Sequence, residues 1–416
     1  MWRPLDIVEW KGKRRAGLDD VRTSVAEIIS MVRNGGDRSL RDLTVRFDKV
    51  QLQDIAISKE VRQRALKETD QKLIADLRSA AERIRRFHEM QIKNASWMKE
   101  VEPGIHLGVK LTPLRRIGAY VPGGRASYPS TALMCVIPAK VAGVKEVVCC
   151  TPPPVNPLTL AALEIAGVDE VYQLGGAQAI AAMALGTESI RPVQKIVGPG
   201  NVYVTAAKML LREYAEIDFP AGPSEVAIIA DSSANPDFVA SDILAQAEHD
   251  PRSACILITT DADVADKVGA AMEMMLRTAA RGDILSRSME NTGYVIAKDL
   301  EEAAAISDEV APEHLSIQTR EPLKVLEKVH NAGSIFIGPY APVACGDYAS
   351  GTNHVLPTAG YAALFSGLDT RHFCKTSSVQ MLDKQGLERI ADVVESLAEA
   401  EGLKAHAGSI RIRRTG

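Results

Sequence analysis

The sequence lacks a long apolar segment. Its longest apolar run, around residues 132–137, is interrupted by Pro138 and Lys140, far short of the roughly 20 residues that span a bilayer. The first residues, Met1 to Asp6, do not show the charged and then apolar order of a signal peptide. These absences exclude a membrane-spanning helix and give no indication of export.

Neither the cysteines nor the charges follow a specialised pattern. The six cysteines have no CxxC spacing and no regular framework, which predicts reduced thiols and a cytoplasmic protein. The 49 Lys and Arg residues nearly balance the 53 Asp and Glu residues, giving a net charge of -4, and no basic block stands out. Neither a nucleic acid nor a membrane is therefore expected as a partner.

Two common catalytic motifs are missing as well, because the chain has neither GxGxxG nor HExxH. What it does have is 416 residues, of which 46% are hydrophobic and 25% charged. This is the balance of a soluble globular protein, and the length allows two or more domains of typical size.

The chain begins with a helical pattern. Apolar residues recur at helical spacing over 20–31, and Gly35-Gly36 predicts the end of that helix. A second helical pattern covers 73–90, and residues beyond about 369 return to helix, especially over 387–403.

From about Gly118 the pattern changes to short apolar runs separated by helix-like stretches, which is typical of βα units and a mostly parallel sheet. The strands predicted this way are 146–150, 170–174, 195–197, 226–230, 255–259, 294–297, 315–318 and 334–337. Residues 142–147 and 166–171 share a sequence pattern 24 residues apart, as expected for successive βα units. This many strands predicts two sheets.

Gln246 and His249 are three residues apart on a predicted helix that starts with Asn235-Pro236 and runs over 237–249. Side chains with this spacing lie on one helix face, so the pair suits metal coordination if Asp347 and His406 reach the same place. Imidazole and oxygen ligands without thiolate indicate zinc first, with manganese or cobalt as substitutes. The alternative is that the pair only satisfies backbone groups at the helix end.

Glu313 and His314 follow Pro312, which should end the preceding helix near Val310, and they precede a predicted strand. Histidine titrates near neutrality, so His314 suits proton transfer from an alcohol, and a neighbouring glutamate suits deprotonation of water. The alternative is a solvent-facing loop. The glycine-rich turns at 121–124, 174–178 and 198–201 permit close approach of a phosphate or ring, or serve turn geometry alone.

Ordered blocks along almost the whole chain resemble histidinol dehydrogenase. They are Tyr120-Val-Pro-Gly-Gly124, Pro129-Ser-Thr-Ala-Leu-Met134, Gly175-Gly-Ala-Gln-Ala-Ile180, Gly198-Pro-Gly-Asn201, Ala221-Gly-Pro-Ser-Glu225, Gln246-Ala-Glu-His249, Pro312-Glu-His-Leu315, Gly346-Asp-Tyr-Ala-Ser-Gly-Thr-Asn-His-Val-Leu-Pro-Thr358 and Glu401-Gly-Leu-Lys-Ala-His406.

The resemblance implies an α/β fold of tandem incomplete Rossmann-like domains with mostly parallel sheets. It implies an N-terminal arm (1–14), a larger domain with the metal and catalytic residues (15–118 and 226–368), a second domain on the NAD side (119–225) and a small C-terminal helical dimerisation region (369–416). It also implies a homodimer whose active site is shared between the subunits.

The implied reaction is the four-electron oxidation of L-histidinol through L-histidinaldehyde to L-histidine, the last steps of histidine biosynthesis, with two NAD reduced and one zinc per subunit. By resemblance, Gln246, His249, Asp347 and His406 match the zinc ligands, His314 the base, and Glu313 the residue that activates water. Residues matching substrate contacts are Ser224, His354 and Glu401 together with Gln246, His249, His314, Asp347 and His406. Tyr120, Gln178 and Asn201 match the NAD site.

Three other interpretations are open on the residues. A paralogue of the same fold would oxidise another small alcohol, such as a sulfonated diol, but the retained Ser224, Glu401 and His406 disfavour it. A zinc hydrolase would use the metal to activate water, yet no HExxH helix supports it. A non-catalytic metal-binding protein would leave Glu313 and His314 unused.

Overall fold

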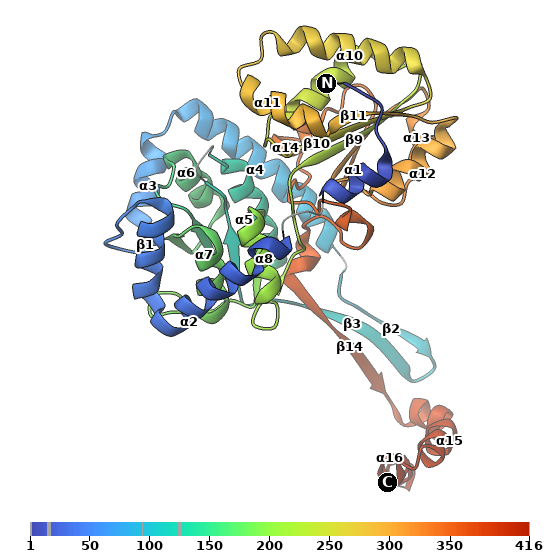
Figure 1. Cartoon of the computed structure of the whole chain (residues 1–416). Coiled ribbons are helices and arrows are strands. Elements are labelled where there is room, and N and C mark those ends of the chain that lie inside the picture. The colour runs from blue at the N-terminus through green and yellow to red at the C-terminus, as the bar shows by residue number, and fades with distance from the viewer. Residues whose placement is uncertain (1, 15–17, 94, 124–126, 416) are drawn as a thin grey trace. The chain divides into compact units, whose positions relative to one another are not determined.

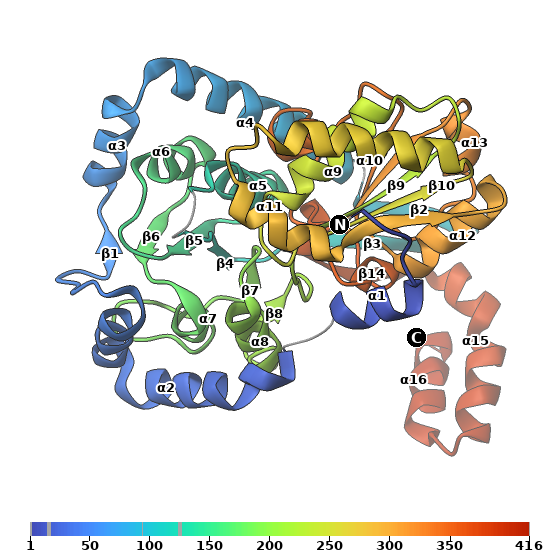
Figure 2. The ribbon, with the colours of Figure 1, turned by 45° about the horizontal axis from the view of Figure 1, so that its top comes forward.

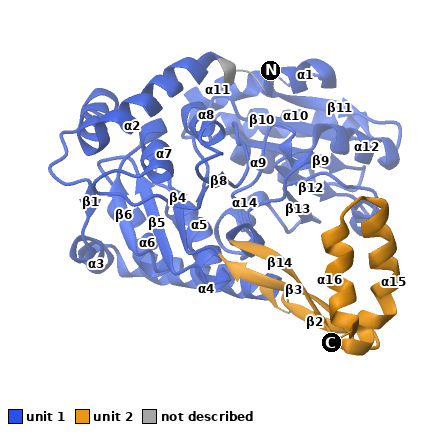
Figure 3. Cartoon of the chain, turned by 90° about the horizontal axis from the view of Figure 1, so that it is seen from below, with its two compact units in different colours: residues 1–91, 114–373 blue, residues 92–113, 374–416 orange. Residues whose placement is uncertain are grey.

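The computed structural model describes residues 2–14, 18–93, 95–123 and 127–415. It has two mostly parallel sheets and one small antiparallel sheet, with helices alongside (Figure 1), so the predicted α/β class is confirmed. The chain divides into two compact units (Figure 3). Unit 1 comprises residues 1–91 and 114–373, and unit 2 comprises residues 92–113 and 374–416.

The first sheet of unit 1 has the strand order β1-β6-β5-β4-β7-β8, and all its neighbours are parallel except β1 and β6. Its strands are β1 (Ala56–Ile57), β4 (Arg116–Tyr120), β5 (Glu146–Thr151), β6 (Glu170–Gln173), β7 (Lys195–Val197) and β8 (Glu216–Ile217). The helices on this side of unit 1 (Figure 2) are α2 (Leu18–Asp48), α3 (Lys59–Glu68), α4 (Gln71–Ile92), α5 (Pro129–Ala142), α6 (Pro157–Ala166), α7 (Gly176–Leu185) and α8 (Val202–Leu210).

The second sheet of unit 1 is parallel throughout, in the order β11-β10-β9-β12-β13. Its strands are β9 (Glu225–Ala230), β10 (Ala254–Thr259), β11 (Thr292–Ile296), β12 (His314–Gln318) and β13 (Ser334–Ile337). Its helices are α1 (Ile7–Arg14), α9 (Pro236–Ala247), α10 (Ala262–Leu276), α11 (Gly282–Ser288), α12 (Leu300–Val310), α13 (Pro322–Leu326) and α14 (Val343–Tyr348), with 3-10 turns η1 (Met289–Asn291) and η2 (Tyr361–Ala363). A third 3-10 turn, η3 (Thr370–Phe373), packs against α5 on the side of the first sheet.

Unit 2 is an antiparallel sheet followed by a helical hairpin. The strand order is β14-β3-β2, with strands β2 (Trp97–Glu102), β3 (Ile105–Pro113) and β14 (Cys374–Leu382). Helices α15 (Lys384–Ala400) and α16 (Lys404–Thr415) complete it and pack on each other. Every residue of β2 is exposed.

Local chemistry explains why the parallel units form. Strand β9 reads Glu-Val-Ala-Ile-Ile-Ala and is buried along its whole length, as expected for a parallel strand covered on both faces. Helix α9 begins as the sequence predicts, with the Asn235 side chain accepting a hydrogen bond from Asp237 N–H and Pro236 in the first turn. All eight strands predicted from apolar runs are present.

The predicted helix end at Gly35-Gly36 is present. The element labelled α2 joins two helices across a kink at Gly36, where φ is 49° and ψ is -136°, and the second helix, which the sequence pattern did not predict, continues to Asp48. The backbone N–H of Asp37 donates to the Glu188 carboxylate at 2.8 Å. A side chain from elsewhere therefore satisfies a donor freed by the break, and the helix resumes.

Within the residues that the structure describes, none of the helices has the length and apolar character needed to cross a membrane.

Candidate active site

The centre of the candidate site is a pair of glutamates where two parallel strands begin side by side. His314 of β12 is in register with Val226 of β9, which brings Glu313 next to Glu225. The backbone N–H of Glu225 donates to the Glu313 carboxylate at 2.8 Å, and the backbone N–H of Glu313 donates to the Glu225 carboxylate at 3.2 Å. Both side chains are buried.

The two glutamates differ in their charge partners. Arg14 donates to Glu225 Oε2 at 2.9 Å, and both members of this ion pair are almost completely buried. Burial raises the pKa of Glu313 well above its ordinary range, and the negative charges of Glu225 and Asp347 raise it further. Glu313 therefore carries a carboxyl group that holds its proton strongly and, once ionised, is a strong base.

His314 is held by one ring nitrogen and leaves the other free. Its Nδ1 lies 3.2 Å from the carbonyl oxygen of Glu225, which fixes Nδ1 as the donor and Nε2 as the acceptor. Nε2 is buried and has no hydrogen-bond partner among the described residues, and the Asp347 Oδ1 atom is 3.9 Å away. Burial lowers the pKa of His314 to about 3, so the imidazole is neutral.

Asp347 and His354 come from α14 and the segment after it. The His354 Nδ1 atom lies 2.9 Å from the Asp347 carbonyl oxygen and 3.9 Å from Asp347 Oδ1, and its Nε2 is 3.1 Å from the Thr131 hydroxyl on α5. His354 thus connects the two halves of unit 1. Burial lowers the pKa of His354 to about 4 and raises that of Asp347 to about 7.

Gln246 and His249 lie at the end of α9, which packs against α14. Gln246 is only 2% exposed, yet its side-chain Nε2 has no partner in the described chain. The surface of His249 is partly open to solvent, but burial around its imidazole lowers its pKa. The imidazole also lies close enough to His314 and His354 to lower the pKa of each. The structure therefore places His249 and Asp347 near His314, and it places Gln246 on the last turn of the helix that precedes His249.

The other predicted substrate and metal residues lie elsewhere in the chain. Ser224 is half-buried immediately before β9, and its carbonyl oxygen accepts from Ala254 N–H at 3.2 Å. Glu401 ends α15 and His406 lies in the first turn of α16, and both are exposed. These last two residues belong to unit 2, so unit 1 by itself contains six of the eight predicted substrate and metal residues.

The three candidate cofactor residues lie at the carboxyl ends of strands of the first sheet or in the segments just after them. Tyr120 ends β4, and its hydroxyl accepts from Gly176 N–H at 3.1 Å. Gln178 is buried in the first turn of α7. The Asn201 side chain caps α8 by accepting from Tyr203 N–H and Val204 N–H, which is a structural role it fills without a ligand.

Glycine is required where the turn after β7 meets Tyr120. Gly198 has a φ of 111°, and a Cβ there would collide with the Tyr120 carbonyl oxygen. Lys208 Nζ donates to the Gly198 carbonyl at 3.0 Å, and Asp218 accepts from Gly198 N–H at 2.8 Å, while the two buried side chains pair with each other. Hydrogen bonds to both the N–H and the carbonyl of Gly198 therefore fix the turn.

Sequence reasoning missed Arg14, Thr131 and the role of Glu225. Glu225 ends one of the blocks that carry the family resemblance, and this is the only signal that marks it. Thr131 likewise lies within one of those blocks, whereas Arg14 has no distinguishing local pattern. Their roles depend on contacts between segments far apart in the chain.

Together the fold and the site define an α/β enzyme with a neutral buried histidine, a buried glutamate beside it, and glycine-rich turns at the carboxyl edge of a neighbouring sheet.

The chain belongs to the histidinol dehydrogenase family, whose model matches residues 12–414. It is 55% identical over 404 residues to histidinol dehydrogenase of Methanosarcina barkeri, covering 96% of this chain and 93% of the relative. It is 50% identical over 412 residues to that of Methanothermobacter thermautotrophicus, covering 98% and 96%. The crystal structure of histidinol dehydrogenase from Elizabethkingia anophelis matches with a TM-score of 0.93 at 38% identity, covering 99% of this chain and 96% of that one.

Proposed function

We propose that the chain oxidises L-histidinol through L-histidinaldehyde to L-histidine, reducing two NAD per substrate and binding one zinc per subunit. Family membership makes it an NAD-dependent histidinol dehydrogenase of the final steps of histidine biosynthesis. The zinc, the residue roles and the cytoplasmic location are the proposal. The observation that carries it is His314, whose buried Nε2 is unpartnered among the described residues while Nδ1 is held by Glu225.

The side chains of unit 1 fit a zinc ion, although no group of three or more His, Cys, Asp or Glu among the described residues is arranged to hold a metal. The proposed zinc ligands differ from such a group in two ways. One ligand is the amide of Gln246, beside His249 and Asp347, and another is His406 from unit 2 of a second copy of the chain. Zinc would be held by the Oε1 atom of Gln246. Its Nε2 atom is a buried donor without a partner among the described residues and needs a separate acceptor, which a bound substrate could supply. When bound, zinc would orient the imidazole and amino nitrogens of the substrate.

In the first oxidation, His314 Nε2 is suited to accept the hydroxyl proton of histidinol as a hydride passes from the adjacent carbon to the nicotinamide ring. The products are the aldehyde, NADH and the proton on His314. Burial keeps the imidazole neutral, and neutral is the form that accepts a proton. The ring of Phe336, with its centroid 5.9 Å from that of His314, helps to fix the orientation of the base.

In the second oxidation, Glu313 is suited to take a proton from the water that adds to the aldehyde. Once His314 has released its first proton to solvent, the ionised hydrate loses a second hydride to a fresh NAD. The remaining hydroxyl proton passes to His314, leaving the carboxylate product. The backbone N–H of Glu225 holds the Glu313 carboxylate in place. Retaining the aldehyde between the steps protects it from side reactions in water.

The remaining proposed residues contact the substrate or the cofactor. Ser224 and His354 border the Glu313 and His314 pair, and Glu401 is assigned to the substrate from unit 2. The dinucleotide is assigned to Tyr120, Gln178 and Asn201, where clamped glycine turns permit close approach of its phosphates. This assignment explains how the chain uses NAD without GxGxxG.

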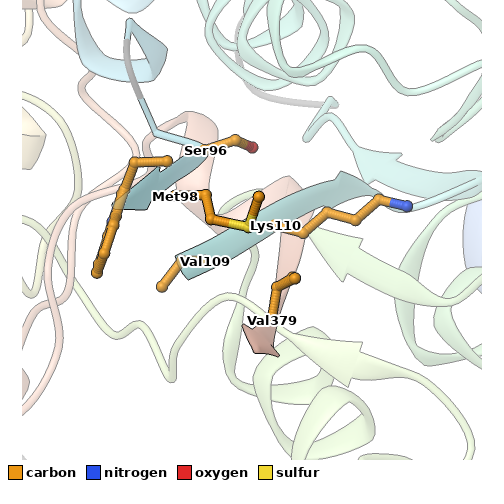
Figure 4. A pocket seen from close by; sticks show the side chains of 6 residues that line it. Ser96, Met98, Val109, Lys110 and Val379 are labelled. Carbon is orange, nitrogen blue, oxygen red and sulfur yellow. The ribbon is translucent and has the colours of Figure 1, made fainter. Parts of the chain in front are cut away.

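A homodimer with a shared active site completes the proposal. Unit 2 exposes apolar side chains on its strands and helices, among them Trp97, Met98, Val101, Met381 and Leu397. A pocket of about 300 Å³ (Figure 4) lies between Trp97, Met98, Val109 and Val379. Exposed apolar side chains gathered on one unit are typical of a surface that binds another protein. We assign this surface to a second copy of the chain, which supplies Glu401 and His406.

The test is NADH formation by the purified protein with L-histidinol, comparing zinc-loaded and chelated samples. Two NADH per histidinol, abolished by chelation and restored by zinc, are expected. A single NADH per substrate would contradict the role of Glu313, and full activity after complete zinc removal would contradict the metal assignment.

A further inference from the structure

Asp48 has a carboxylate that the fold does not compensate. It is the last residue of α2, where the helix dipole disfavours a negative charge. Its Oδ2 atom is buried without a hydrogen-bond partner in the described parts of the chain, and burial raises its pKa. The neighbouring Lys49 does not neutralise it, because Lys49 Nζ donates instead to the Arg46 carbonyl at 2.8 Å.

The backbone around Asp48 is also unfavourable. Lys49 has a φ of 60°, in the left-handed region that side chains other than glycine rarely adopt. Asp48 is half-buried, and one of its carboxylate oxygens is buried without a partner in the described chain. At the C-terminal end of a helix and before a strained residue, such a group costs stability. Such a combination is typical of a position retained for a ligand.

Asp48 lies beside the turn assigned to the cofactor. A Cβ on Gly175 would lie 3.4 Å from Asp48 Oδ1, and it would also crowd Pro152 after β5. The next residue, Gly176, donates its N–H to the Tyr120 hydroxyl, and the charge of Asp48 contributes to raising the pKa of Tyr120. Asp48, Tyr120 and the start of α7 therefore meet at the carboxyl edge of the first sheet.

The chemistry of a lone carboxylate selects its ligand. It accepts hydrogen bonds and repels anions, so it suits a pair of neighbouring hydroxyl groups and opposes a phosphate. In dinucleotide-binding folds an acidic side chain commonly accepts from a ribose 2′-hydroxyl, whereas a 2′-phosphate needs a cation. Here the acid comes from the end of α2 and not from the strand that usually carries it.

We propose that Asp48 accepts hydrogen bonds from the hydroxyl groups of the adenosine ribose of bound NAD, and that it excludes the 2′-phosphate of NADP. The inference rests on the proposed placement of the dinucleotide at Tyr120, Gln178 and Asn201. It deepens that placement by naming the residue that sets cofactor specificity.

The test compares steady-state kinetics of Asp48→Asn and Asp48→Ser with NAD and with NADP. Loss of charge-assisted hydrogen bonds should raise the KM for NAD about 10- to 100-fold with little change in kcat, and should lower the ratio of kcat/KM for NAD over NADP at least as much. The KM for histidinol should stay unchanged. Asp42→Asn, an exposed aspartate on the same helix, is the matched control and should behave as the unmodified protein.

The variant Gln178→Ala tests the placement of the dinucleotide separately from the role of Asp48. If it raises the KM for NAD while folded Asp48 variants keep the original cofactor ratio, the role of Asp48 is wrong and the placement stands. If neither residue affects the KM for NAD, the placement itself is wrong. Failure of both Asp48 variants to fold would show a structural role for the carboxyl group and overturn the inference.

Discussion

The carboxylates of Glu225 and Glu313 each accept a hydrogen bond from the other residue's backbone N–H, at 3.2 and 2.8 Å. The reciprocal arrangement fixes both side chains without giving them the same chemistry. Burial raises the pKa of both carboxyl groups, but Arg14 pairs with Glu225, whereas no lysine or arginine among the described residues pairs with Glu313. The first therefore acts as a support for the site, and the second as the group with reactive potential.

Glu225→Gln should destabilise the protein by about 3 kcal/mol, because removing one partner of a buried ion pair leaves the other charge uncompensated. Urea unfolding measures the change. Glu309→Gln is the control, since Glu309 also pairs with a cation of α1, Lys11, but is 53% exposed, and its loss should cost about 0.5 kcal/mol or less. Equal costs for the two variants would show that the Arg14 pair is not a structural support.

His314→Asn should lower both oxidation steps about 10²- to 10⁴-fold, the usual contribution of a positioned general base. Zinc content should not change, because the imidazole is assigned as a base and not as a ligand. Metal analysis beside the kinetics checks both parts. Loss of zinc in this variant would contradict the assignment.

Glu313→Gln should slow the oxidation of histidinaldehyde more than its reduction by NADH, because only the oxidation consumes water. The glutamine keeps the acceptor for Glu225 N–H but loses the base. Rates from added aldehyde in the two directions measure the difference. Equal losses would mean that Glu313 serves general positioning.

Asp242→Asn should stabilise the protein at neutral pH. Burial raises the pKa of Asp242 to about 6, so the folded state binds the proton more tightly than the unfolded state, and ionisation above pH 6 costs stability that returns as the pH falls toward 4. The expected gain is about 3 kcal/mol at pH 7 and is mostly lost by pH 4. The asparagine carbonyl keeps an acceptor for Gln318 Nε2, which donates to Asp242 Oδ2 at 3.0 Å. Unfolding curves at both pH values decide, and a pH-independent difference would contradict the titration.

The parallel core could be predicted from the sequence, because the predicted strands 226–230 and 255–259 are almost continuous apolar runs, and both lie within buried strands of the structure. The sheet of unit 2 could not be predicted. Strand β14 reads Cys-Lys-Thr-Ser-Ser-Val-Gln-Met-Leu and is mostly exposed, so it carries neither an apolar run nor a clear alternation. Its structure depends on pairing with β3, which lies far away in the chain.

The same limit applies to the site. Glu313, His314 and Asp347 could be singled out as reactive types at predicted element ends, and the structure brings them together. The contact of Glu225 with Glu313 joins residues 88 positions apart and follows from the register of β9 and β12. The local sequence pattern contains no information on that register. The contact of Glu225 with Glu313 could therefore be recognised only in the folded structure.

Hybrid dimers test whether two subunits build one site. Subunits with His406→Ala and subunits with Glu313→Gln and His314→Asn should each be inactive alone. If His406 serves the neighbouring subunit, each hybrid dimer holds one intact site, and random mixing should restore about a quarter of the original activity.

Affinity tags of two kinds on the two variants allow the hybrids to be isolated and counted. Mixing without subunit exchange is the control for residual activity of the parents. Inactive hybrids, once shown to contain both variants, would mean that each site takes its histidine from its own chain. In that case the exposed apolar side chains of unit 2, such as Trp97 and Met98, would hold subunits together without completing the chemistry.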